Sequence, residues 1–163
     1  MKKLLSLGVA SLLFAMTTLS GTTLSAGQDG DVNEGIRDRF IGAWRLAWLE
    51  EEGADGTVHR ADCVGMLVFT REGRISVQVM YRNPEAGTPA GPVQYAQGGY
   101  EASFGRYEVD ASAHTFTYHV EGALVRSLVG KDLTRRFELS GEQLIVMSSS
   151  PGEQWRVAWE HYQ

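Results

Sequence analysis

Residues 133–161 read LTRRFELSGEQLIVMSSSPGEQWRVAWEH, and this stretch decides the fold class. It holds three runs rich in apolar, β-branched and aromatic residues, at 133–139, 143–147 and 154–161. Ser140-Gly141 and Pro151-Gly152 separate these runs, and such dipeptides are typical of tight turns. Neighbouring strands that are joined by short turns pair antiparallel. The stretch therefore predicts an antiparallel meander of three strands.

The same pattern continues upstream, with strands predicted at 43–51, 57–60, 64–70, 74–82, 100–109 and 114–124. Asp55-Gly56 and Glu72-Gly73 mark two further turns. The whole chain thus has eight or nine short strands. A meander of this size protects its edges best by closing on itself. We predict an all-β fold, an antiparallel up-and-down β-barrel. A solid barrel or a sandwich without a cavity is the alternative.

The first 26 residues have the layout of a secretory signal peptide. Lys2 and Lys3 precede an apolar run at 4–16, and a polar stretch then ends in Ser25-Ala26. A transmembrane anchor is the competing interpretation, but the run is shorter than the roughly 20 residues that a membrane-spanning helix needs. We expect cleavage after Ala26, a periplasmic or secreted mature protein, and no stable membrane anchor.

Residues 27–33 are polar and glycine-rich, which predicts a flexible lead-in. Asn33 can cap a short N-terminal helix that runs to about Phe40, with apolar side chains at helical spacing. Residues 34–163 are then long enough for one domain with a hydrophobic core.

Charge and motif content exclude several classes of function. Without Lys2 and Lys3 the chain has 13 basic and 20 acidic residues and no basic stripe, so nucleic acid is not an expected partner. Cys63 is the only cysteine in the sequence and cannot form an internal disulfide. His114 and His119 are five residues apart and would point to opposite faces of a strand, which predicts no metal pair. The familiar catalytic and phosphate-binding motifs are absent from the sequence, and we expect no cofactor.

The strand at 74–82 leaves open which face is inside. Its inner row is either Ile75, Val77, Val79 and Tyr81, or Ser76, Gln78 and Met80. The apolar row is the default, whereas a ligand cavity needs a few polar groups in its wall. Tyr107 shares a row with Ser103 and Gly105, whose small size would leave room beside the ring.

Two further strands carry polar residues of uncertain direction. His119 and Glu121 share one face, and form either an acid–base pair inside the barrel or its wet outer surface. One of Arg135 and Arg136 must point inward unless the strand bulges. An inward arginine needs a carboxylate, an anion or an aromatic face beside it.

Residues 40–46, FIGAWRL, resemble the opening of a lipocalin, a short helix leading into Gly-x-Trp on the first strand. More specifically, several ordered segments resemble the bacterial lipocalin-like domain family: GRISVQVM at 73–80, FGRYEVD at 104–110, HVEGAL at 119–124 and RRFELSGEQL at 135–144. The likeness runs from about residue 40 to 162 and implies a small cup-shaped barrel. It also implies an inward row of Ser76, Gln78 and Met80. Finally, it implies that Arg156 of the last strand stacks on Trp44 at the barrel base.

We therefore expect an exported lipocalin-like protein that binds a small, largely apolar molecule in its barrel. The expected ligand contacts are Ser76, Gln78, Tyr107, His119 and Arg136, and the expected structural pair is Trp44 and Arg156. A cyclase, isomerase or hydratase of polyketide-like substrates is the alternative, with His119 or Tyr107 as the acid or base inside. A solid structural barrel is the third hypothesis, favoured if the row of Ile75 fills the centre and Gln78 lies in solvent.

Overall fold

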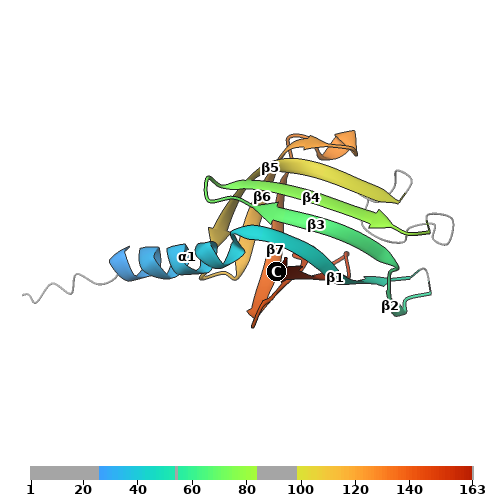
Figure 1. The fold of residues 1–163 in the computed structure, drawn as a ribbon, viewed down its shortest axis with the longest axis horizontal. Coiled ribbons are helices and arrows are strands. Elements are labelled where there is room, and N and C mark those ends of the chain that lie inside the picture. The colour runs from blue at the N-terminus through green and yellow to red at the C-terminus, as the bar shows by residue number, and fades with distance from the viewer. Residues whose placement is uncertain (1–25, 54, 84–98, 163) are drawn as a thin grey trace, which may run out of the picture.

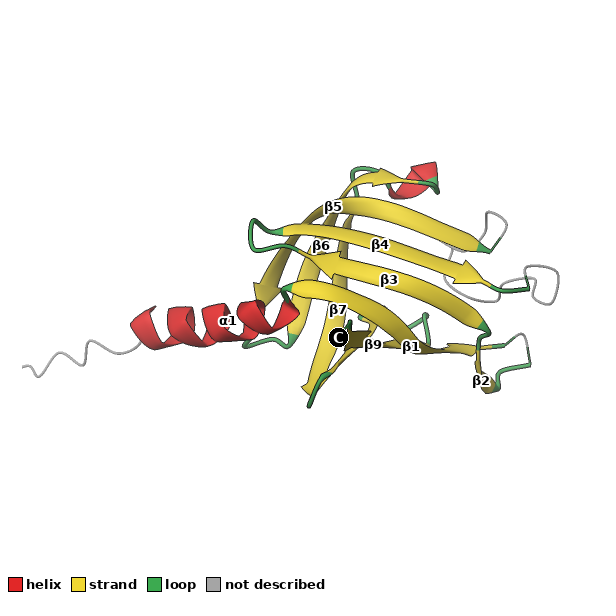
Figure 2. Ribbon diagram, viewed as in Figure 1, coloured by secondary structure: helices red, strands yellow, loops and turns green. Residues whose placement is uncertain are grey.

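The structure, a computed structural model, describes residues 26–53, 55–83 and 99–162. The predicted signal peptide therefore lies, up to residue 25, outside the described residues. The described chain forms one curled antiparallel sheet with the helix α1 (Ala26–Phe40) at one end (Figure 1). Strands make up most of the described chain (Figure 2). The predicted all-β barrel is confirmed.

Within the described residues, nine strands form the sheet, and each end lies within one residue of the sequence prediction. They are β1 (Gly42–Glu52), β2 (Val58–Arg60), β3 (Cys63–Phe69), β4 (Arg74–Tyr81), β5 (Tyr100–Asp110), β6 (Thr115–Ala123), β7 (Asp132–Ser140), β8 (Gln143–Ser148) and β9 (Trp155–His161). A short 3-10 helix, η2 (Arg126–Leu128), lies between β6 and β7. The turn residues Gly73 and Gly141 have φ values of +82° and +59°, which glycine adopts without a steric penalty.

The barrel closes between the first and last strands. β3 to β9 pair in chain order, and β1 pairs with both β3 and β9. β2 is an extra strand that pairs with the end of β1, at residues 50–52. Closure of eight strands removes the free edges. The interior of such a barrel is wide enough to be filled by side chains or to hold one small ligand.

The helix α1 is longer than the sequence predicts. It begins at Ala26, so residues 27–33, predicted as a flexible lead-in, form its first turns. Asn33, predicted as the cap, lies inside the helix, and its Oδ1 accepts a hydrogen bond from the backbone N of Ala111 at 2.8 Å. This contact joins the helix to the turn after β5. Tertiary contacts of this kind stabilise a helix and cannot be predicted from its local composition. Within the described residues, no helix has the length and apolar character to span a bilayer.

Aromatic side chains seal the barrel at the end where α1 meets it. Phe40, the last residue of α1, is fully buried. Its ring centroid lies 5.0 Å from that of Phe69 and 4.9 Å from that of Phe137, both edge-to-face. Phe116 and Tyr107 complete the group around Phe40. We call these five residues the floor cluster. Aromatic pairs in such geometries stabilise a core beyond the area that they bury.

Trp44 secures the junction between α1 and β1. Its Nε1 donates a hydrogen bond to the carbonyl oxygen of Phe40 at 2.8 Å, which satisfies a carbonyl at the helix C-terminus. The ring of His161 packs on the indole, with centroids 3.6 Å apart. A side chain at Gly42 would begin 2.8 Å from that imidazole, so the first residue of the Gly-x-Trp motif has no room for one.

The predicted pairing of Trp44 with Arg156 is wrong. The residue opposite Trp44 on β9 is His161, whereas Arg156 lies opposite Glu50, six residues further along β1. The Arg156 guanidinium lies 5.8 Å from the ring centroid of Trp48 instead. The antiparallel register places the start of β9 against the end of β1, and therefore far from the floor cluster.

Candidate functional site

The inner row of β4 is apolar. Ile75 and Val79 are 3% and 1% exposed, whereas Gln78 is exposed and Ser76 faces outward with it. The prediction that Ser76, Gln78 and Met80 point inward, which the family resemblance had favoured, is wrong. The apolar row faces inward because burying branched apolar side chains is favourable, whereas a buried glutamine needs hydrogen-bond partners. This is the arrangement that favours a solid barrel, so the presence of a cavity depends on the other strands.

A small cavity of about 70 Å³ remains in the half of the barrel away from α1. Most of its lining is apolar: Leu67, Ile75, Val77, Val79, Phe116, Val120, Leu128, Leu133, Val146, Val157 and Trp159. The polar or partly polar lining consists of Glu101, Ser103, Tyr118, Arg135 and Trp155. Apolar walls with a few converging polar groups are typical of small-molecule sites.

Glu101 and Ser103 bring a hydrogen-bonded carboxyl into this cavity. They lie two residues apart on β5 and therefore face the same side, in the row that Tyr107 and Gly105 share. Ser103 Oγ donates to Glu101 Oε1 at 3.0 Å. Burial raises the pKa of Glu101 to about 7, although the hydrogen bond from Ser103 and the charge of Arg135 both act to lower it. Glu101 therefore changes its protonation state near neutral pH.

The inward arginine of β7 is Arg135, not Arg136. Arg135 lines the cavity, and its guanidinium lies 5.1 Å from the ring centroid of Trp155. Arg136 is exposed on the outer face, where its Nε donates to the carbonyl oxygen of Ser148. The prediction of Arg136 as an inner ligand contact is therefore wrong. Phe137 is buried, and alternation along the strand places Arg135 in the same inner row.

Tyr118 brings a hydroxyl into the cavity that has no hydrogen-bond partner among the described residues. Its side chain is 5% exposed, and Oη is fully buried. Burial raises the pKa of Tyr118 to about 12, while the nearby Ser103 side chain acts in the opposite direction. Buried hydroxyls in native proteins nearly always have a partner, so an unsatisfied one beside a cavity marks a position where a ligand atom or a water can bind.

Tyr107 points inward as predicted, but into the floor cluster. Its Oη donates to the carbonyl oxygen of Thr70 at 3.0 Å, and its ring packs edge-to-face on Phe69. Tyr107 is not among the cavity-lining residues. The prediction of Tyr107 as a ligand contact thus has the correct face of the strand, but the side chain is directed into the floor cluster and not into the cavity.

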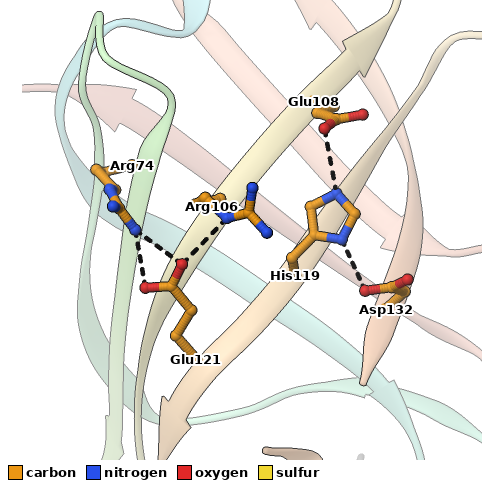
Figure 3. A network of polar contacts seen from close by, with 6 residues as sticks. All are labelled: Arg74, Arg106, Glu108, His119, Glu121 and Asp132. Carbon is orange, nitrogen blue, oxygen red and sulfur yellow. Dashed lines mark hydrogen bonds and ion pairs between the residues drawn. The ribbon is translucent and has the colours of Figure 1, made fainter. Parts of the chain in front are cut away.

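His119 lies on the outer surface (Figure 3). Its Nδ1 is 2.7 Å from Asp132 Oδ1, and its Nε2 is 3.7 Å from Glu108 Oε1. Beside it, Glu121 binds Arg74 and Arg106. The interpretation of this row as the wet outer surface is confirmed, and His119 cannot act on a molecule inside the barrel. The acid–base role on which the enzymatic alternative depended is therefore absent for His119.

A second buried carboxylate, Glu51, lies at the same end of the barrel as the cavity. Tyr81 Oη donates to Glu51 Oε2 at 2.6 Å, and His59 Nε2 lies 3.4 Å from Oε1. Burial and this hydrogen bond raise the pKa of Tyr81. Glu51 is turned inward because the pairing of β1 with β9 shifts register between Leu46 and Trp48, which reverses the alternation.

None of the polar cavity residues was predicted as a ligand contact, although Arg135 was one of two possible inward arginines and Ser103 was placed in the row of Tyr107. The row of Tyr107 and Ser103 leads directly to Glu101, two residues further along β5. Likewise, Leu133 and Phe137 share their row with Arg135. Within the part of the chain that the structure describes, no group of three His, Cys, Asp or Glu side chains could hold a metal ion.

These observations define a class: a closed up-and-down β-barrel with a Gly-x-Trp opening, a sealed floor and a small interior cavity. The model of the family described as "Lipocalin-like domain" matches residues 41–161, which is the whole barrel. The chain belongs to this family.

Among solved structures, the chain is similar to a lipocalin-like protein from Bacteroides uniformis, with a TM-score of 0.44 and 17% sequence identity. The match covers 76% of this chain and 99% of that chain. A search of curated protein sequences finds no significant match.

Proposed function

We propose that this protein is an exported lipocalin-like binding protein that takes a small, largely apolar molecule into its barrel. The observation that carries the proposal is the cavity itself, in which Glu101, Ser103, Tyr118 and Arg135 converge among apolar walls. We call these four residues the polar set. Burying such groups costs stability, and a fold without a ligand to bind gains nothing from keeping them beside an empty space.

The size of the cavity limits the ligand. Its volume of about 70 Å³ is smaller than the roughly 150 Å³ engineered cavity that holds a benzene molecule. Drug-sized ligands occupy pockets of about 300–1,000 Å³. The bound molecule is therefore small, or only a narrow part of it enters the cavity and the remainder lies toward the end of the barrel opposite α1.

Binding is tested with methyl cis-parinarate, a neutral dye with a narrow polyene chain whose fluorescence rises in apolar surroundings. We expect saturable binding by the wild-type protein. Val77→Phe fills the cavity and should abolish binding, whereas the matched change Ser76→Phe adds the same ring to the outer face of β4 and should preserve it. Circular dichroism confirms that both variants fold. Equal dye binding by both would place the site outside the barrel and contradict the proposal.

Export is tested separately, by the intact mass of the protein recovered from the periplasm or medium of a bacterial host. The mature form should lack residues 1–26. A full-length chain retained in the membrane fraction would contradict this part of the proposal.

A further inference from the structure

We infer that the cavity recognises its ligand by an uncharged hydroxyl group, an alcohol or a phenol, held between Tyr118 and Glu101. This inference rests on the proposed function and specifies the chemistry of the same site. It depends on an unsatisfied buried donor, on the balance of charge in the cavity lining, and on the contrast with a second tyrosine.

Tyr118 supplies the first argument. Its Oη is buried beside the cavity and lacks a partner among the described residues. The Ser103 side chain is close enough to influence the pKa of Tyr118, but it lies outside hydrogen-bond geometry to Oη and donates its own hydrogen to Glu101 at 3.0 Å. An oxygen atom of a ligand at this position would accept a hydrogen bond from Tyr118 and remove the penalty of the unsatisfied hydroxyl.

The charges of the lining supply the second argument. Of the lining residues described, one is acidic, Glu101, and one is basic, Arg135. Arg135 also lies over the ring of Trp155. A ligand carboxylate would be desolvated next to the like charge of Glu101. A ligand ammonium would be desolvated next to the like charge of Arg135. An uncharged group avoids both penalties.

The hydrogen-bonding capacity of the polar set then selects a hydroxyl. Tyr118 has a hydrogen to donate, and the Glu101 carboxylate has oxygens that accept. A hydroxyl accepts from the first and donates to the second, which a hydrocarbon cannot do. Because burial holds the pKa of Glu101 at about 7, the carboxyl also exists in its protonated form near neutral pH, and it can then donate to the same oxygen.

Tyr107 supplies an internal comparison. Tyr107 and Tyr118 are directly paired across β5 and β6, and both face the interior. The hydroxyl of Tyr107 donates to the carbonyl oxygen of Thr70. The hydroxyl of the tyrosine in the floor cluster therefore has a hydrogen-bond partner, whereas the hydroxyl of the tyrosine that borders the cavity has none among the described residues.

The experiment compares four molecules with the same narrow five-carbon chain: 1-pentanol, pentane, pentanoate and pentylamine. Binding is followed by tryptophan fluorescence, since Trp155 and Trp159 line the cavity, and by shifts of backbone amide signals in NMR spectra. We expect wild type to bind 1-pentanol about tenfold more tightly than the other three, as one added hydrogen bond provides. Tyr118→Phe should weaken 1-pentanol binding to the level of pentane and leave pentane unchanged. Tyr162→Phe, the same change at an exposed tyrosine, should alter neither.

The melting temperature gives a second readout. Because the Tyr118 hydroxyl has no partner among the described residues, Tyr118→Phe should leave the melting temperature unchanged or raise it. A lower melting temperature with unchanged ligand preference would make the hydroxyl structural and overturn the inference. Equal affinities across the four molecules, with dye binding intact, would also overturn it but leave the proposed function standing. Absence of binding by both the dye and the four molecules would overturn the proposed function as well.

Discussion

The two ends of the barrel interior differ in how completely their polar atoms are satisfied. At the floor, aromatic rings from α1 and four strands interlock around Phe40, and the Tyr107 hydroxyl has a backbone partner. Beside the cavity, Tyr118 has a hydroxyl without a partner among the described residues, and Glu101 has a carboxyl with a raised pKa. The polar atoms of the floor are therefore better satisfied, whereas the buried polar groups beside the cavity lower stability.

The largest effect is expected at the floor. Phe40→Ala removes the ring at the centre of the floor cluster and leaves a cavity that rigid strands cannot fill. We expect a loss of about 3–5 kcal/mol in the free energy of unfolding, measured by urea denaturation. Val32→Ala, at an exposed position of the same helix, should cost less than about 0.5 kcal/mol. A small effect of Phe40→Ala would show that α1 does not seal the barrel.

The next effect is a pH dependence that arises at the cavity end. The pKa of Glu101 is about 7 in the folded protein against an ordinary value of 4.5, so the folded state holds the proton more tightly. This contribution to stability is complete below about pH 4.5 and is lost as pH rises through 7. A difference of this size corresponds to roughly 3 kcal/mol.

Urea denaturation between pH 4.5 and 8 measures this effect. In Glu101→Gln, which keeps an acceptor for Ser103, the pH-dependent loss should disappear. Glu138→Gln, on the exposed face of β7, should leave the loss unchanged. An identical pH profile for wild type and Glu101→Gln would mean that Glu101 titrates normally.

The paired tyrosines give a smaller and more direct comparison. Tyr107→Phe removes a hydrogen bond to the carbonyl of Thr70, which keeps its second bond from the Gly73 backbone N, and should cost about 1 kcal/mol. Tyr118→Phe should cost nothing. Thermal denaturation of the two variants side by side measures the difference. Equal destabilisation would contradict the proposed contrast between the two ends of the barrel.

The smallest effect belongs to the outer surface. Glu121 binds Arg74 at 2.8 Å and Arg106 at 3.1 Å, but all three side chains are well exposed (Figure 3). We expect Glu121→Gln to cost less than about 1 kcal/mol, because water and salt screen such pairs. Urea denaturation with and without added sodium chloride should show a cost that decreases with salt. A large, salt-independent cost would indicate a structural role for this network.

The family resemblance and the alternation of residues differed in their value for predicting the site. Alternation alone would have placed Ile75 and Val79 inside β4, and it was correct there. The inward row that was inferred from the resemblance, with Gln78 inside, was wrong. Family likeness transfers the barrel well, because the barrel depends on many residues. A single polar ligand contact cannot be predicted from the family in the same way, because it depends on which side chains of one strand face inward.

The sequence alone predicted eight or nine antiparallel strands and the turns between them, and it favoured a closed barrel while leaving a sandwich open. Side-chain alternation and glycine at left-handed turns are local patterns, and both can be recognised in the sequence of a single segment. Only the tertiary structure decided which end of the interior is sealed. That choice depends on Phe40 reaching rings on β3, β5, β6 and β7. It directs Tyr107 into the floor cluster, whereas its cross-strand partner Tyr118 borders the cavity. The inward turn of Glu51 has the same origin, because a shift in strand register reverses the alternation and arises only when β1 pairs with β9.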